Sequence, residues 1–274
     1  MKTLVTFAFL AFSLIDLKAQ SLGSNRVNLL KSSVVRILTD GIGTGTGFII
    51  TDKGHVVTCW HVIEYALNSK KKLQIEFSSG EIVEAQYLTA LLEGGMRKAV
   101  GYDYIVLAPI NPRTKFSFLK LGNFSSVAEG DELITMGYPF GISQPVIAKG
   151  IMSTKWIQTA SFFINNKQDS IARNVAWLDL TMNKGNSGGP IIKLGVTPED
   201  DRVIGIATFI LNPFANPAQQ ISNIYSNPSW DIQMGGVSTS KVNKLFADAI
   251  ANNSIGVSGC ISIDHILEFL NATK

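Results

Sequence analysis

The sequence has few charged residues, cysteines and histidines, and each shortage excludes a class of protein. Charged residues make up 16% of the 274 residues, and the net charge is +3. The longest basic run is Lys70 to Lys72, so the chain lacks the clustered charge of a nucleic-acid-binding surface. The three histidines show no paired ligand spacing, and the cysteines number only two. We therefore expect no nucleic-acid partner, no metal and no organic cofactor.

The two cysteines, Cys59 and Cys260, leave two interpretations open. Export from the cytoplasm would permit a disulfide between them. Cys59 stands in a strongly apolar stretch, which equally suits a buried free thiol. The sequence alone does not decide between the two.

An apolar run without charged residues lies at the start of the chain. Lys2 precedes the apolar residues 3–15, and the small residue Ala19 follows them. This order is typical of a secretory signal peptide, and the run is too short to cross a bilayer comfortably. An uncleaved anchor is the alternative. We expect a signal peptide at 1–19, an exported protein in the periplasm or outside the cell, and no stable membrane anchor.

Apolar residues make up 46% of the chain, enough for a substantial core. A polar arm at 20–33 precedes many short apolar runs separated by turn residues. This pattern predicts an all-β barrel or sandwich and not alternating strands and helices. The expected strands are 34–38, 48–50, 55–58, 73–77, 82–88, 104–109, 132–136, 147–153, 175–180, 190–193 and 203–209.

The last quarter of the chain breaks this strand pattern. Residues 211–235 hold three prolines and many asparagines, which predicts a long loop, and loops of this length are often functional. Helical spacing then predicts a helix ending near Ile250, with its apolar face packed on the barrel. A short helix is expected over 262–271. The apolar residues of the first helix are Val242, Leu245, Phe246, Ala249 and Ile250.

Three residues in order along the chain could carry nucleophilic chemistry. Ser187 stands in a bare glycine-rich turn, His61 follows an apolar strand, and Asp103 opens another. Each alone has an ordinary structural explanation. Together they supply the hydroxyl, the imidazole and the carboxylate that serine catalysis needs. Their order is that of the chymotrypsin-type arrangement.

On these residues the sequence resembles a chymotrypsin-fold, trypsin-like serine protease, most of all the HtrA (Deg) family. The resemblance implies two six-stranded antiparallel β-barrels over 34–250, followed by a helical tail at 251–274. His61 and Asp103 would come from the first barrel and Ser187 from the second. The similar segments are 45–50, 58–62, 103–107, 130–131, 137–141, 183–190 and 203–206.

The resemblance also assigns a binding site around the serine. Gly185, Asn186 and Ser187 would form the oxyanion hole, with the N–H groups of Gly185 and Ser187 as donors. Asn186 carries no charge to pair with a cut N-terminus, so we expect no activation of that kind. The pocket base has no carboxylate, and we expect cleavage after small or medium aliphatic residues. The expected pocket residues are Thr181, Ala207, Phe209 and Ile210.

The sequence also departs from the family pattern. About 24 residues follow Ile250, too few for the PDZ domain that HtrA proteins usually carry. The short N-terminal arm puts the family's trimer in doubt, although an oligomer stays open. The expected function is that of a serine endopeptidase acting on polypeptides, with unfolded proteins among the candidate substrates. The alternatives are a chaperone or binding protein with an idle site, and a processing protease of narrow specificity.

Overall fold

A computed structural model describes residues 22–88, 95–112, 115–229, 231–252 and 256–272. The expected signal peptide at 1–19 lies outside these ranges. Within them, no helix combines the length and the apolar character that crossing a membrane requires.

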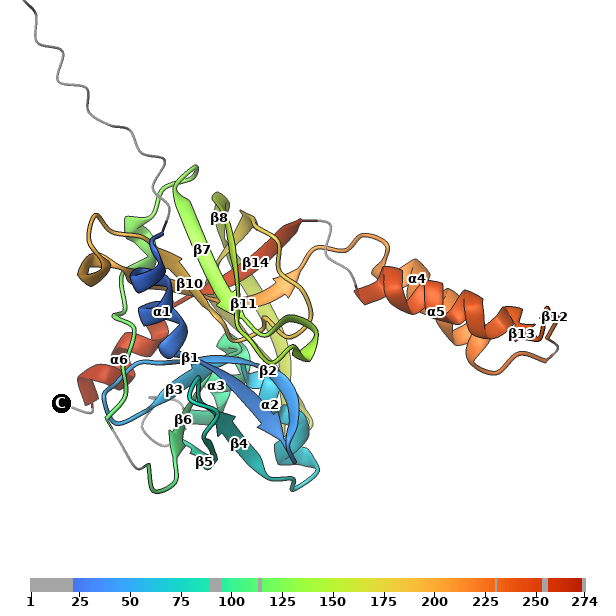
Figure 1. Ribbon diagram of the computed structural model, residues 1–274, viewed down its shortest axis with the longest axis horizontal. Coiled ribbons are helices and arrows are strands. Elements are labelled where there is room, and N and C mark those ends of the chain that lie inside the picture. Colours follow the sequence, from blue (N-terminus) through green and yellow to red (C-terminus); the bar gives the residue numbers. More distant parts are fainter. Residues whose placement is uncertain (1–21, 89–94, 113–114, 230, 253–255, 273–274) are drawn as a thin grey trace, which may run out of the picture.

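Six antiparallel strands close the first barrel in the order β1-β2-β3-β6-β5-β4 (Figure 1). The turn from β1 to β2 is formed by Asp40 and Gly41, both with positive φ, as a two-residue hairpin requires. The strands β1, β3 and β6 are almost wholly buried because their second faces are covered as well. The strands are β1 (Val34–Thr39), β2 (Ile42–Ile49), β3 (Val56–Thr58), β4 (Leu73–Glu76), β5 (Ile82–Tyr87) and β6 (Ile105–Pro109).

The second barrel closes in the order β10-β11-β14-β9-β8-β7, which confirms the expected pair of six-stranded barrels. β14 contributes its sixth strand, so the barrel continues past residue 250 and the stretch 251–274 is not only helical. β8 and β9 extend beyond the barrel as a two-stranded ribbon. The strands are β7 (Glu132–Gly137), β8 (Val146–Ile164), β9 (Lys167–Asp179), β10 (Pro190–Lys193), β11 (Arg202–Ile210) and β14 (Val257–Ser262).

Short helices fasten the two barrels together. In α1 (Ser24–Ser32), Arg26 forms an ion pair with Asp201, which lies just before β11. After β14 the chain returns to the first barrel in α6 (Asp264–Ala272), where the His265 ring stacks on Tyr102 with 3.6 Å between ring centroids. The other α-helices in the described part of the barrels are α2 (Trp60–Asn68) and α3 (Gly95–Tyr102).

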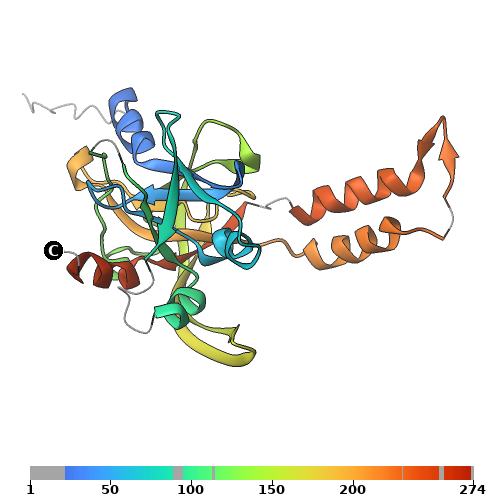
Figure 2. The same ribbon diagram turned by 90° about the horizontal axis from the view of Figure 1, so that it is seen from below.

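The loop expected at 211–235 is instead part of a helical hairpin, which we call the arm (residues 211–252). It consists of α4 (Ala215–Ser226), the short strands β12 (Gln233–Met234) and β13 (Val237–Ser238), and α5 (Thr239–Asn252). The helix expected near 242–250 is present as α5. Its expected packing on the barrel is wrong, since the arm projects away from both barrels (Figures 1 and 2) and Leu245 is 70% exposed.

Cys59 and Cys260 are both free and buried, which favours the thiol interpretation over the disulfide. Burial raises the pKa of Cys260 to about 12 and that of Cys59 well above its ordinary value. We expect neither thiol to react with Ellman's reagent in the native protein, and both to react after denaturation without reductant. A native protein that yields no thiol even when denatured would contradict this.

Candidate active site

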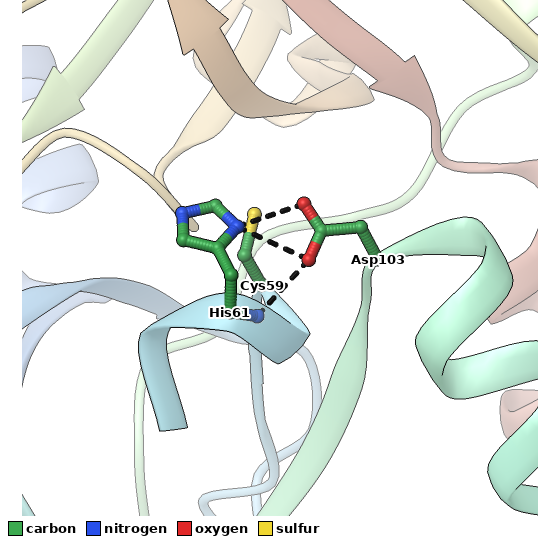
Figure 3. A group of neighbouring side chains, drawn as sticks. All are labelled: Cys59, His61 and Asp103. Atoms are coloured by element: carbon green, nitrogen blue, oxygen red, sulfur yellow. Dashed lines mark hydrogen bonds and ion pairs between the residues drawn. The ribbon is translucent and has the colours of Figure 1, made fainter. Parts of the chain in front are cut away.

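Asp103 holds His61 at two points (Figure 3). His61 lies in the first turn of α2, directly after β3, and its backbone N–H donates to Asp103 Oδ1 at 3.0 Å. The ring atom Nδ1 lies 2.8 Å from Oδ2 and 3.1 Å from Oδ1 of the same carboxylate. Because a carboxylate accepts, Nδ1 carries the proton and Nε2 is left as the acceptor. The carboxylate therefore fixes both the orientation and the tautomer of the imidazole.

The charge of Asp103 also sets the proton affinity of His61. Burial of the ring lowers the pKa of His61, while the hydrogen bond and charge of Asp103 raise it. The net result is a pKa above the ordinary value of 6.5. Such a ring accepts a proton readily, which suits a general base.

Asp103 occupies a constrained position between α3 and β6. Its φ of 56° lies in the left-handed region, which aspartate tolerates better than most residues. Its N–H donates to Val100 O at 3.2 Å, which closes the last turn of α3. The sequence reasoning did not predict α3, because the short segment 95–102 carries no clear apolar repeat.

The β8–β9 ribbon, which extends from the second barrel, packs against α3. Figure 2 shows the ribbon curving beneath that helix. Arg97 of α3 forms a two-pronged ion pair with Asp169 at 2.6 and 3.0 Å. Arg173 of β9 donates to Gly101 O at 3.4 Å. A Cβ on Gly101 would lie 2.7 Å from ribbon side chains, so the contact depends on glycine. The ribbon thus supports the segment that presents Asp103.

The loop that carries Ser187 is bonded to both barrels. Ser187 O accepts from the N–H of Thr46 in β2 at 2.9 Å, and the N–H of Gly188 donates to Ala207 O in β11 at 2.8 Å. Gly188 has a φ of +87°, and a Cβ there would lie 2.1 Å from Thr46 O. Only glycine fits this position, which explains the bare sequence around the serine.

Two N–H groups of this loop have no acceptor in the part of the chain that is described. Gly185 and Ser187 donate no hydrogen bond there, whereas Asn186 donates to Asn183 O at 3.0 Å. The Lys184 carbonyl accepts from Phe140 N–H at 2.7 Å. In a trans peptide the C=O and the following N–H point in opposite directions, so the Gly185 N–H points away from Phe140. Of the three residues expected in the oxyanion hole, Gly185 and Ser187 thus offer free donors and Asn186 offers none.

Thr46 connects the serine loop to its neighbour, a role that the sequence reasoning missed. Its hydroxyl donates to Gly185 O at 2.6 Å and accepts from Tyr138 N–H at 3.0 Å. The residue is fully buried, so neither bond competes with water. β2 holds two threonines between glycines, and nothing in the sequence distinguishes Thr46 from Thr44 for this role.

Replacing Thr46 by valine keeps the shape but leaves two buried polar groups without partners. Each such group costs about 1–3 kcal/mol, so we expect kcat to fall by roughly 10- to 100-fold as the Gly185 loop shifts. Thr46→Ser retains the hydroxyl and serves as the control. Steady-state kinetics of both variants checks this, and equal losses in the two would show that the hydroxyl is not what matters.

An apolar cavity opens beside Ser187. Its walls include Met182, Ala207, Phe209 and Ala251, and none of the described residues that line it is acidic. Ala207 and Phe209 lie where the sequence placed them. Thr181 does not: it is exposed, and its neighbour Met182 lines the cavity instead.

The sequence predicts Ile210 in the pocket and does not predict Ala251 there. The backbone of Ile210 belongs to β11, and its side chain lies outside the described part of the structure. Ala251 comes from the base of the arm, so the arm borders the pocket. Sequence reasoning could not find Ala251, because no motif links it to Ser187.

Cys59, His61 and Asp103 place potential metal-binding atoms within 4.8 Å of one another. The set does not suit a metal. Burial raises the pKa of the Cys59 thiol well above its ordinary value, and Nδ1 of His61 is already bonded to Asp103. We assign no metal to this cluster.

In the described part of the chain, no hydrogen bond joins Ser187 to His61. Their backbones are nevertheless held on adjoining elements, since Gly45 packs between Val62 of α2 and Ser187 O. Catalytic hydrogen bonds are often long without substrate and shorten in the complex. The arrangement can therefore support proton transfer from a serine hydroxyl to a carboxylate-bound imidazole.

Comparison with known proteins agrees with this geometry. The family model of the trypsin-like peptidase domain matches residues 45–206. A probable periplasmic serine endoprotease DegP-like of Rickettsia prowazekii is 30% identical over 172 residues, covering 63% of this chain and 29% of the relative. Serine protease HTRA4 of Mus musculus is 31% identical over 182 residues, covering 65% and 33%. The chain spans about a third of the length of these relatives.

Solved structures show the same fold at lower identity. The HtrA-type protease AlgW with tripeptide has a TM-score of 0.57 at 19% identity, covering 90% of this chain and 62% of that one. Deg5 has a TM-score of 0.50 at 22% identity, covering 70% and 88%. The chain belongs to the trypsin-like peptidase family, among the serine proteases of the HtrA type.

Proposed function

We propose that the chain is a serine endopeptidase in which Ser187, His61 and Asp103 form the catalytic triad. The observation that carries the proposal is the two-point grip of Asp103 on His61, with Nδ1 at 2.8 Å from Oδ2. It leaves Nε2 as the acceptor for a serine proton. The site lies beside an apolar pocket and a loop with two free N–H donors.

The residues divide the work of peptide hydrolysis. Ser187 Oγ attacks the scissile carbonyl carbon while His61 Nε2 takes its proton, and the Asp103 carboxylate stabilises the imidazolium. The N–H groups of Gly185 and Ser187 stabilise the negative oxygen that forms. His61 then protonates the departing amine. In the second half of the reaction, His61 Nε2 takes a proton from water, which attacks the acyl carbon. His61 then returns the proton to Ser187 Oγ as the acyl–oxygen bond breaks.

Activity on an unfolded protein tests this assignment. We expect the signal-free chain to cleave unfolded casein and the Ser187→Ala variant to leave it intact. Cleavage without a preceding N-terminal cut would also support the role given to Asn186. Casein cleavage that survives Ser187→Ala would remove the serine from the mechanism.

The pocket favours small or medium aliphatic side chains before the cleaved bond. Met182, Ala207 and Phe209 make its walls apolar, and Lys184 is the charged residue beside it. A basic substrate side chain would enter without a carboxylate to pair with. We expect a peptide library to be cleaved after residues such as valine or alanine, and a profile dominated by arginine would contradict this.

We propose that residues 1–19 act as a signal peptide and that the protein is exported. The Rickettsia prowazekii relative is described as probably periplasmic. Fractionation of cells that express the full chain tests this, with processing near Ala19 as the expected result. Retention of the unprocessed chain in the cytoplasm would contradict it.

One observation favours a second candidate, a chaperone or binding protein with an idle site. Ser187 and His61 are not hydrogen-bonded in the described residues, so the nucleophile is not yet activated. In that case casein would bind without being cleaved, and Ser187→Ala would change nothing.

A further inference from the structure

The two helices of the arm contact each other through small residues. Ala218 and Ser222 of α4 are buried, as are Ser240 and Ala247 of α5. Ser222 Oγ donates to Asp248 Oδ1 at 2.5 Å, and Lys244 reaches the other oxygen of that carboxylate, also at 2.5 Å. Among the described residues of the arm, those that are buried are therefore all small.

Five large apolar side chains of the arm lie on one outer face. Phe214, which immediately precedes α4, and Ile221 and Ile224 within it follow one another at spacings of seven and three residues, which places them in one stripe. On α5, Phe246 and Ile250 are one turn apart. Measured from the helix contact at 3.6 residues per turn, both stripes fall on the same side of the hairpin. We call these five residues the apolar face.

The opposite side of the arm is polar. On α4 it carries Asn216, Gln219 and Asn223, with Gln219 bonded to Asn223 at 3.1 Å. On α5 it carries Lys241 and, one turn later, Leu245, which is 70% exposed. The hairpin is thus two-sided, with a mainly polar side toward water and an apolar side that has no partner in the described structure.

The apolar face is large enough to bind another surface. Its five side chains are 45–67% exposed. With roughly 150–250 Å² for a whole large side chain, they present roughly 500 Å². Two such faces together would bury roughly 1,000 Å², the lower end for a specific protein interface. Contact between two arms would therefore be specific but reversible.

We propose that the apolar face binds the same face of a second copy of this chain, so that two arms form an antiparallel four-helix bundle. Stripes at three- and four-residue spacing pack against stripes of the same kind. None of the five residues is charged, so a symmetric contact brings no like charges together. The arm carries two acidic and two basic residues, which gives no net charge to oppose the approach of its copy.

The composition of the polar side argues against a membrane as the occupant. Helices that lie on membranes usually carry many lysines or arginines on their polar side. Here that side is rich in asparagine and glutamine.

The base of the arm is connected to the pocket beside Ser187. Asn212 Nδ2 donates to Ile250 O at 2.6 Å and to Ala251 O at 3.2 Å. The stem of the arm is thereby tied to the residue that lines the pocket.

Sedimentation velocity of the full chain carrying Ser187→Ala tests the pairing without self-cleavage. We expect a dimer at high concentration that dissociates on dilution. Adding Ile224→Glu and Phe246→Glu should abolish the dimer, while Gln219→Glu and Asn223→Glu add the same charge on the polar side and should leave it intact. Ile224→Ser and Phe246→Ser provide a milder pair, and far-UV circular dichroism checks that each variant folds.

Several results would overturn the proposal. These are a monomer at every concentration, a dimer that survives both pairs of apolar-face substitutions, or a dimer lost equally in the polar-side control. Vesicles of phosphatidylcholine and phosphatidylglycerol provide the remaining comparison. A chain that stays monomeric and floats with these vesicles would assign the apolar face to lipid instead. None of these readouts requires the chain to be catalytically active.

Discussion

Asp103→Asn is expected to lower kcat by about 10⁴-fold while leaving the fold intact. The carboxylate accepts two bonds from His61, one from the backbone N–H and one from Nδ1. An amide in its place can donate to Nδ1, which would put the imidazole proton on Nε2. The base would then have no lone pair directed at Ser187. Steady-state kinetics on a cleaved peptide measures the loss.

The pH profile separates this electrostatic role from a purely structural one. In the parent chain only the unprotonated His61 can act as base, so kcat/KM should fall as the pH drops through a pKa above 6.5. In Asp103→Asn the residual activity should fall at a lower pH, because the charge that raises the pKa of His61 is gone. The control is Asp131→Asn, a surface carboxylate paired with Lys193 in the second barrel. Loss of activity with an unshifted profile would contradict the assignment.

Gly185→Ala is expected to lower kcat by about 10²- to 10³-fold, the usual cost of losing one oxyanion donor. Gly185 has a φ of +103°, and a Cβ there would lie 2.4 Å from Tyr138 O. The backbone of both segments must move to admit it. The bond from Phe140 N–H to Lys184 O, which turns the Gly185 N–H away from Phe140, would be broken by that movement.

Gly130→Ala is the matched control for this substitution. Gly130 has a φ of +88° and no atom within 4 Å of the added carbon, so it carries the backbone strain without the clash. We expect Gly130→Ala to lose some thermal stability and to keep its kcat. If both variants lose kcat equally, the clash at the serine loop is not the cause.

The sequence is most informative where the backbone conformation or a close contact permits only one kind of residue. Gly188 must be glycine because of its φ and its contact with Thr46, so the stretch around Ser187 was recognisable without a structure. Short strands with turns between them led to the right fold class. His61 and Asp103 could be chosen because each stands at the end of an apolar strand.

What the sequence could not supply depends on contacts between distant segments. The hydroxyl of Thr46 acts on Gly185, and Ala251 reaches the pocket from the end of a projecting hairpin. β14 was missed because its six residues are interrupted by glycine and serine. The arm was misinterpreted because a stripe of apolar residues normally indicates packing on the nearest core. Here that stripe faces outward.

Labelling with a fluorophosphonate probe tests the central assignment most directly. The probe forms a bond with a serine oxygen only when a neighbouring base removes its proton, so it reports the working triad and not the fold. We predict that the signal-free chain is labelled on Ser187, that Ser187→Ala is not labelled, and that His61→Ala is labelled far more slowly. The exposed-loop variant Ser125→Ala should label like the parent. An unlabelled parent chain, or equal labelling of Ser187→Ala, would contradict the proposed mechanism.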